Sequence, residues 1–478
     1  MISSLAILNF EFSGEDEAQV VYYAKRCLAR QSVGTVTTYR HGPLRVFLLL
    51  PMVLSNSFRP WVYRLPSLLL NCLSLWPLYK LLQINLGAEN VPFAFFLYTL
   101  LIGWLPIFQL TFVSGYSFFI LFMLYFYILY TQNRDEKYLL YFSICCVIAM
   151  GFHEELILYF IPAFLFFRNN KGTSKNSTLS IASFLLPVLY LIIYIIWASI
   201  PIIWASAPTK IPGIKPDNIP WLTYQLKRLS LQNGMLAHLS QRLSDIGTFN
   251  FKDVLTFFIS HTSVFFVGLS VLGMVFYFYN YLYKKDKTRD NFTANLGQMV
   301  FFFLPQIIVW GLVFKTVAWG HFTQVWILPY FFILYLVFHN KIYFKAVRFF
   351  TVVFFLLTFY QSVCLLYLNH PSLPALFFYD LSYKRVDYAR SGPYGKYEIG
   401  QWIRANSLPE DSLITNLDGS MFLFYADRPH ANDVRSAKYY VQYKGPKPLF
   451  TPKEYELIRK KVFPKAEIFE VKPRTLAN

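Results

Sequence analysis

The feature that most constrains this chain is a series of long apolar stretches separated by short polar loops. A membrane helix needs about 20 mostly apolar residues to cross about 30 Å of hydrocarbon. The stretches that approach this length are 65–83, 91–112, 116–131, 138–152, 156–167, 179–200, 262–283, 297–316, 322–338 and 346–368. Those at 116–131, 138–152 and 156–167 are short for a span. We therefore predict an all-α polytopic membrane protein with about ten transmembrane helices and additional interfacial helices.

Composition excludes several other classes of protein. Of the 478 residues, 55% are hydrophobic, with 50 Phe, 35 Tyr and 10 Trp, which excludes a disordered chain and argues against a soluble enzyme. The net charge of +18 does not predict a nucleic-acid partner, because the Lys and Arg residues flank apolar stretches. There they act as orientation signals and contact membrane lipids.

Loop charge predicts the orientation of the spans. Four basic loops separate pairs of spans, at 134–137, 168–175, 284–289 and 341–348. All four lie on one side if 138–167 crosses twice, with a turn at 153–155, whereas a single crossing puts them on opposite faces. The positive-inside rule favours two crossings, with the basic loops cytoplasmic. Segments 11–64, 153–155, 201–261, 317–321 and 369–478 then face the outer side.

The outer segments divide the chain into two expected domains. Residues 1–368 form a transmembrane domain with outer loops 11–64 and 201–261, and residues 369–478 form a C-terminal extracytoplasmic α/β domain. In the first loop, 18–28 and 46–54 are expected to be interfacial helices. In the tail, 397–405 and 452–461 are expected to be helices, and 412–415 and 466–471 strands. Residues 1–10 are apolar but too short to span, so either the chain begins outside or a first helix lies upstream.

An acidic pair opens the first outer loop. Asp16 and Glu17 stand where a helix is expected to start, and a helix dipole favours acids in its first turn. Alternatively, one of the two carboxylates removes a proton from an acceptor hydroxyl at the membrane surface.

Basic residues follow on the same outer side, against the usual charge bias. Headgroup contact is the favoured interpretation for Arg45 and Arg59, whereas Arg40, His41 and Arg64 are candidates to bind a lipid phosphate. A forked guanidinium suits that task.

Two further polar groups interrupt or end apolar spans. His153, Glu154 and Glu155 lie between two spans, where ionisable groups are either functional or a polar cap at the surface. His321 lies at an outer span boundary, either in an interfacial aromatic belt or facing a ligand. The His-Glu-Glu sequence lacks the second His of a zinc-protease helix, and no metal site is predicted. The five cysteines have no metal-ligand or disulfide spacing.

Several motifs are absent from the sequence. It has no phosphate-cradling Gly-Lys loop, no dinucleotide-binding Gly pattern and no nucleophile elbow. Nucleotide-driven transport and soluble cofactor chemistry therefore lose support.

Taken in chain order, these motifs resemble the C-type polytopic glycosyltransferases, in the branch of protein O-mannosyltransferases and bacterial aminoarabinose transferases. The motifs that carry the resemblance read Asp16-Glu17, Gly42-Pro43-Leu44 and Arg64-Leu65-Pro66-Ser67. A polar break between later spans and a C-terminal outer domain complete the plan. The likeness is collinear over most of the chain, although each motif is short.

The resemblance implies a glycosyltransferase that takes a sugar from a polyprenyl or dolichyl phosphate and inverts the sugar carbon. By resemblance, Asp16 is the general base or positions the acceptor, and Glu17 is its partner. His153 lies nearest the family's phosphate-binding basic residue, which is more often Lys. His321 matches a late outer motif, and Glu154 and Glu155 are accessory candidates.

This chain departs from the family pattern at the outer start of the span 116–131. Relatives often carry an Asp there, whereas this chain has Ser114-Gly115-Tyr116-Ser117. The family's first membrane helix also has no counterpart in this sequence.

The prediction is therefore an integral membrane hexosyl- or pentosyltransferase, in the bacterial inner membrane by preference, with its active site and C-terminus extracytoplasmic. Its donor is a polyprenyl-phosphate-linked sugar, and its acceptor a glycan, a lipid or a protein. No cofactor is certain, and nothing in the sequence supports a divalent metal. The alternatives are a membrane transporter and a catalytically inactive protein that binds lipid-linked sugars.

Overall fold

The computed structural model describes residues 20, 21, 24, 25, 44–55, 60–100, 116–169, 177–204, 264–283, 291–309, 325–339, 344–363, 396–415, 425–428, 431, 437–443, 455–464 and 466–473. Contacts divide these residues into two compact units. The described residues of the first unit are 44–45 and those from 66 to 363. Those of the second unit are 20, 21, 24, 25, 46–55, 60–65 and the described residues from 396 onward.

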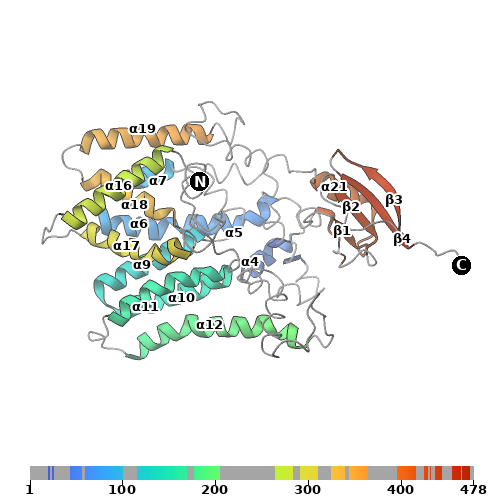
Figure 1. The fold of residues 1–478 in the computed structure, drawn as a ribbon, viewed down its shortest axis with the longest axis horizontal. Helices are drawn as coiled ribbons and strands as arrows, with labels where there is room; N and C mark the ends of the chain where they lie inside the picture. Colours follow the sequence, from blue (N-terminus) through green and yellow to red (C-terminus); the bar gives the residue numbers. More distant parts are fainter. Residues whose placement is uncertain are drawn as a thin grey trace, which may run out of the picture. The chain divides into compact units, whose positions relative to one another are not determined.

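The first unit is helical (Figure 1). Its helices are α6 (Leu75–Leu86), α7 (Val91–Leu100), α9 (Tyr116–Asn133), α10 (Glu136–Phe152), α11 (Phe160–Asn169), α12 (Ser177–Trp204), α16 (Val264–Tyr283), α17 (Asn291–Ile308), α18 (Ile327–His339) and α19 (Phe344–Val363). Two further helices, α4 (Leu44–Val53) and α5 (Pro60–Leu73), run from one unit into the other. Helix α10 packs between α9 and α12, and α16 packs along α18.

The apolar stretches identified in the sequence are helical where the structure describes them, apart from turns at Ser74 and at Val325–Trp326. At the expected turn, α10 ends at Phe152 and a 3₁₀ helix, η1 (Glu154–Tyr159), leads into α11, which also contacts α10. The break at His153 is therefore confirmed. Both expected interfacial helices are also helical where described, at 20–25 and as α4.

The outer faces of these helices are apolar. Among the described side chains, α12 exposes seven large aliphatic ones and α16 exposes a similar row. These are Ile181, Leu185, Leu186, Val188, Leu189, Ile192 and Ile193 on α12, and Val271, Leu272, Val275 and Leu282 on α16. Apolar surfaces of this extent indicate contact with something other than water. Among the described residues, one helical stretch, Val62–Leu86, is by itself long and apolar enough to cross a bilayer. The number of spans stays a prediction.

A polar chain joins three helix ends in the first unit. Gln132 on α9 donates to Asn295 on α17 over 3.0 Å, and Asn295 donates to Asn85 on α6 over 3.0 Å. Asn295 and Asn85 are buried, whereas Gln132 is exposed. The Arg134 guanidinium lies 4.2 Å from the centre of the Phe166 ring. Hydrogen bonds between side chains on neighbouring helices help to hold those helices together. The end of α9, the start of α17 and the end of α6 therefore meet in the first unit.

The second unit contains a four-stranded sheet in the order β1-β2-β4-β3. Its strands are β1 (Leu413–Thr415), β2 (Tyr439–Tyr443), β3 (Tyr455–Val462) and β4 (Ala466–Pro473), and helix α21 (Lys396–Asn406) precedes them. Strands β1 and β2 are parallel, and the remaining pairs are antiparallel. Ile399 and Ile403 of α21 pack on one face, against Leu413, Val441 and Ile468.

One expected element of this unit is wrong. Residues 452–461 were expected to be a helix, whereas Tyr455–Val462 is the edge strand β3. Charged residues such as Arg459 and Lys461 are common on an edge strand, because they discourage pairing with another chain, and they obscure the alternating pattern. A helix at 397–405 and strands at 412–415 and 466–471 are confirmed, and β2 had not been anticipated.

Candidate functional site

His153 stands at the polar break between α10 and η1. Its backbone is extended, with φ −154° and ψ 116°, and its N–H donates to the carbonyl of Ala149 over 2.8 Å. The imidazole is buried, with 4% of its surface exposed. The C-terminal end of α10 carries the partial negative charge of the helix dipole, which favours a cationic side chain at this place.

Tyr116 meets His153, and Arg45 in turn meets Tyr116. The Tyr116 ring, at the first position of α9, lies 5.2 Å from the His153 ring between centroids, at an interplanar angle of 57°. The Nη2 atom of Arg45, on α4, donates to the Tyr116 hydroxyl over 3.5 Å. Arg45 and Tyr116 are 2% and 3% exposed. We call these three residues the cation cluster, since it combines a guanidinium and an imidazole around one phenol.

A glycine allows α4 to approach α10 at the cluster. A Cβ atom built on Gly151 would overlap the side chain of Leu44, and it would lie 3.0 Å from the hydroxyl of Tyr190 on α12. Only a residue without a side chain fits between these groups. Leu44 directly precedes Arg45, so this close packing fixes where the guanidinium enters the cluster.

Arg64 lies on α5, in the second unit. It is fully buried, and the preceding Tyr63 is 1% exposed. A buried guanidinium is costly unless polar groups or an anion surround it.

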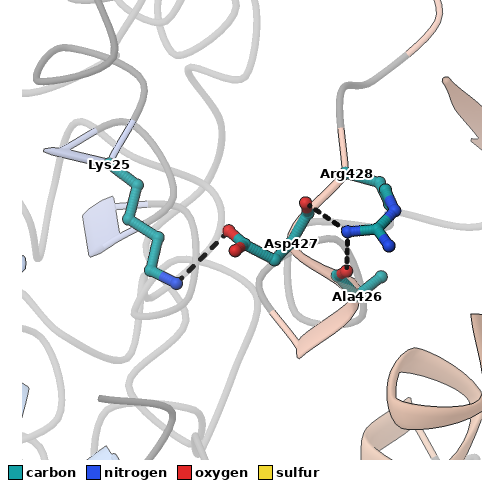
Figure 2. A network of polar contacts seen from close by, with 4 residues as sticks. All are labelled: Lys25, Ala426, Asp427 and Arg428. Carbon is teal, nitrogen blue, oxygen red and sulfur yellow. Dashed lines mark hydrogen bonds and ion pairs between the residues drawn. The ribbon is translucent and has the colours of Figure 1, made fainter. Parts of the chain in front are cut away.

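The second unit also holds an ion pair between the first outer segment and the C-terminal region. Lys25 Nζ lies 3.4 Å from Asp427 Oδ1 (Figure 2). The Lys25 side chain is 13% exposed and that of Asp427 47% exposed. The described residues 20, 21, 24 and 25 therefore belong with the C-terminal sheet rather than with the first unit.

The remaining candidate site residues lie outside the described part of the chain. These are Asp16, Glu17, Arg40, His41 and His321, together with the side chains of Glu154 and Glu155, whose backbone begins η1. Their roles stay predictions. Among the described residues, no group of three or more His, Cys, Asp or Glu side chains could hold a metal ion.

Sequence reasoning missed part of this arrangement. Arg45 was expected to contact lipid headgroups, but it is buried against Tyr116. Tyr116 drew attention only as part of the segment 114–117, where relatives often carry an acid. Asp427 drew none, although an acidic residue directly after the apolar run 421–426 was a usable signal.

The chain was compared with known proteins by sequence and by structure. No protein-family model and no curated protein matches the sequence. Among solved structures, ArnT from Cupriavidus metallidurans bound to undecaprenyl phosphate is similar, with 10% identity, coverage of 100% of this chain and 97% of that one, and a TM-score of 0.59. The apo form of the same protein gives 12% identity, 98% and 95% coverage, and a TM-score of 0.58.

An archaeal enzyme is also similar. The Archaeoglobus fulgidus oligosaccharyltransferase in its apo form has 15% identity, with coverage of 92% of this chain and 69% of that one, and a TM-score of 0.52. Sequence identities this low show a common fold. The resemblance read from the short motifs is therefore confirmed at the level of the fold, which the chain shares with ArnT and with the archaeal oligosaccharyltransferase.

Proposed function

We propose that this protein is an integral membrane glycosyltransferase that moves a sugar from a polyprenyl-phosphate donor to an acceptor hydroxyl on the extracytoplasmic face. The observation that carries the proposal is the buried cation cluster of Arg45, Tyr116 and His153 in a fold shared with a protein bound to undecaprenyl phosphate. The fold supports a transferase of lipid-linked sugars. The sugar and the acceptor rest on the proposal alone.

The cation cluster has the chemistry that a lipid phosphate requires. When a phosphate leaves, negative charge develops on its oxygens, and buried cations stabilise that charge more strongly than water does. The residue of α9 that meets Arg45 is a phenol, where relatives often carry an acid, so Tyr116 does not cancel the positive charge of the guanidinium. Arg64, Arg40 and His41 are the further candidates to bind the phosphate.

The proposed reaction is a single displacement. The acceptor oxygen attacks the anomeric carbon, the bond between that carbon and the phosphate oxygen breaks, and the electron pair leaves with the polyprenyl phosphate. Asp16, assisted by Glu17, takes the proton of the acceptor hydroxyl. Attack opposite the leaving group inverts the anomeric carbon. The apolar outer faces of α12 and α16 are suited to lipid contact, and the polyprenyl chain would enter from the bilayer.

One alternative keeps a specific observation in its favour. Tyr116 and Ser117 begin α9 where relatives often have an acid, so a protein that binds the lipid-linked sugar without turnover fits the same cluster. Release of polyprenyl phosphate distinguishes the two functions.

The experiment uses purified full-length protein and a polyprenyl-phosphate sugar, with free polyprenyl phosphate as the product measured. We expect release by the wild-type protein and a loss of at least about 100-fold in Asp16→Asn, since general-base catalysis contributes about that much or more. Glu89→Gln is the control, because Glu89 is exposed in the loop between α6 and α7. Binding without release would leave the inactive alternative, and unchanged release in Asp16→Asn would remove the assigned base.

A further inference from the structure

The turn that carries Asp427 is fastened to the C-terminal end of α21. Arg428 is 6% exposed, and its Nε donates to Ser407 Oγ over 2.8 Å. Its Nη2 donates to the carbonyls of Ser407 and Arg404 over 2.6 and 2.9 Å. Its Nη1 donates to the carbonyls of Asp427 and Ala426 over 3.2 and 3.4 Å, as Figure 2 shows. One guanidinium thus ties the turn to the helix.

The backbone of Asp427 is set in an uncommon conformation. Its φ is +56°, in the left-handed region that Asp and Asn adopt more readily than other residues with side chains. The neighbouring Tyr425 and Ala426 are fully buried, so the turn has little freedom to relax. The carboxylate is therefore directed by the fold of the C-terminal region.

The Asp427 carboxylate faces the first outer segment. It forms the ion pair with Lys25, on a helical turn whose Val20, Val21 and Ala24 side chains are at most 1% exposed. Tyr63 and Arg64, on α5, are buried in the same compact unit. A fully exposed ion pair contributes little free energy, whereas the Lys25 side chain is only 13% exposed, so this pair can hold the two segments together.

We propose that Asp427 is a positioning residue, through which the C-terminal domain fixes the turn at Lys25, and with it the compact unit that also buries Arg64, for sugar transfer. This inference rests on the proposed function, because it takes Arg64 as a ligand of the donor phosphate. The C-terminal domain then takes part in the reaction, since a small displacement of a charge-stabilising group can lower turnover by up to about 100-fold.

The test uses full-length protein and three variants. Two are the single variants Asp427→Asn and Lys25→Met, and the third is a double variant that swaps the charges, Lys25→Asp combined with Asp427→Lys. Asn retains the left-handed preference and removes the charge, so Asp427→Asn alters the pair without straining the turn. We expect each single variant to lower kcat at least tenfold, with a smaller loss of affinity for undecaprenyl phosphate. The swap restores kcat to within threefold of wild type.

The matched control is a double variant, Arg459→Glu combined with Glu467→Arg. This pair of the same sheet lies 4.0 Å apart, with side chains 62% and 28% exposed. It should leave kcat within twofold of wild type. Wild-type kcat in Asp427→Asn, or a swap that forms a folded protein without recovering kcat, would overturn the inference.

Hydrogen exchange separates this inference from the proposed function. Amides of 18–27 and 60–66 should lose protection in both single variants and regain it in the swap. If the wild-type protein releases no polyprenyl phosphate, the proposed function fails while the exchange result still decides whether Asp427 fixes these segments. If exchange is unaltered in the single variants, the positioning role fails whatever the activity.

Discussion

At the scale of single residues, the burial of Arg45 decides how the cation cluster is interpreted. A side chain at the lipid headgroups would be exposed, whereas Arg45 is 2% exposed and lies within hydrogen-bond reach of Tyr116. A guanidinium can be kept in such a place only by polar partners or a bound anion, because desolvating a charge is costly. A phosphate-binding role satisfies that requirement.

The first prediction concerns the affinity for undecaprenyl phosphate. Arg45→Met should weaken binding about tenfold or more, because a charge-assisted hydrogen bond contributes roughly 1.5–3 kcal/mol and 1.4 kcal/mol is tenfold. Tyr116→Phe, which removes one neutral hydroxyl, should weaken it less. Titration of purified protein with the lipid measures both. Wild-type affinity in a folded Arg45→Met protein would exclude Arg45 from the donor site.

The structural environment of a single residue could be predicted only where the neighbouring sequence determines it. The break at His153 was recognisable because a polar triplet interrupts two apolar stretches. The burial of Arg45 was not, since it depends on the tertiary approach of Leu44 to Gly151. Lys25 and Asp427 are 402 positions apart in the sequence, and no local sequence pattern predicts a contact between residues so far apart in the chain.

At the scale of elements, α16 and α18 illustrate close helix packing. A Cβ atom built on Gly273 would overlap the backbone carbonyl of Phe332, which cannot move as a flexible side chain could. Small residues at such crossings allow backbones to approach in membrane proteins.

We therefore predict that Gly273→Ala destabilises the protein by about 1–3 kcal/mol, the usual effect of overpacking. On the same helix, a Cβ on Gly268 would meet nothing within 4 Å, so Gly268→Ala is the matched control. Thermal unfolding of detergent-purified variants provides the comparison. Equal apparent Tm values for the two variants would show that the helices do not pack this closely.

Strand β4 carries an ion-pair cluster that makes the sheet sensitive to acid. Glu470 lies 2.8 Å from Lys460 and 3.0 Å from Lys438, and hydrogen bonds from Lys460 and then Lys438 lower its pKa from the ordinary 4.5 to about 2. Because the folded-state pKa is the lower one, the contribution to stability is complete above pH 4.5 and is lost as the pH falls toward 2.

Glu470→Gln should therefore reduce the stability of the sheet at pH 7 by on the order of 1–2 kcal/mol, after allowance for partial solvent screening. The difference should shrink between pH 4.5 and 2. Protection of β2 and β4 amides in full-length protein, corrected for intrinsic exchange, reports this directly. A difference that stays constant across that range would mean that the ion pairs contribute nothing.

The expected and observed elements differ for physical reasons. The apolar helices were predictable because about 20 residues of one character are needed to cross a bilayer. Strand β3 was not, because its pattern of Glu456, Arg459 and Lys460 is also that of an exposed helix, and only pairing with β4 settles it. Strand β2 is short and lies within a tyrosine-rich stretch without a clear alternation of apolar and polar residues.

At the scale of the whole molecule, the account requires the acidic pair, the cations and the C-terminal domain to share one face of the membrane. The structure supports part of this requirement. Lys25, eight positions after Glu17, forms an ion pair with Asp427 within the unit that contains the sheet. Within the helical unit, Arg134 lies in the basic segment 134–137, which the charge rule places in the cytoplasm, and Gln132 of the Gln132–Asn295–Asn85 chain lies two positions before it.

The most direct test is the accessibility of single cysteines in sealed vesicles of known orientation, made in a cysteine-free protein. Position 16 represents the acidic pair, 410 the exposed surface of the C-terminal domain and 137 the exposed start of α10. We predict that an impermeant maleimide labels 16 and 410 from the extracytoplasmic face and 137 only from the cytoplasmic face. Labelling of 16 and 410 from opposite faces would contradict the account.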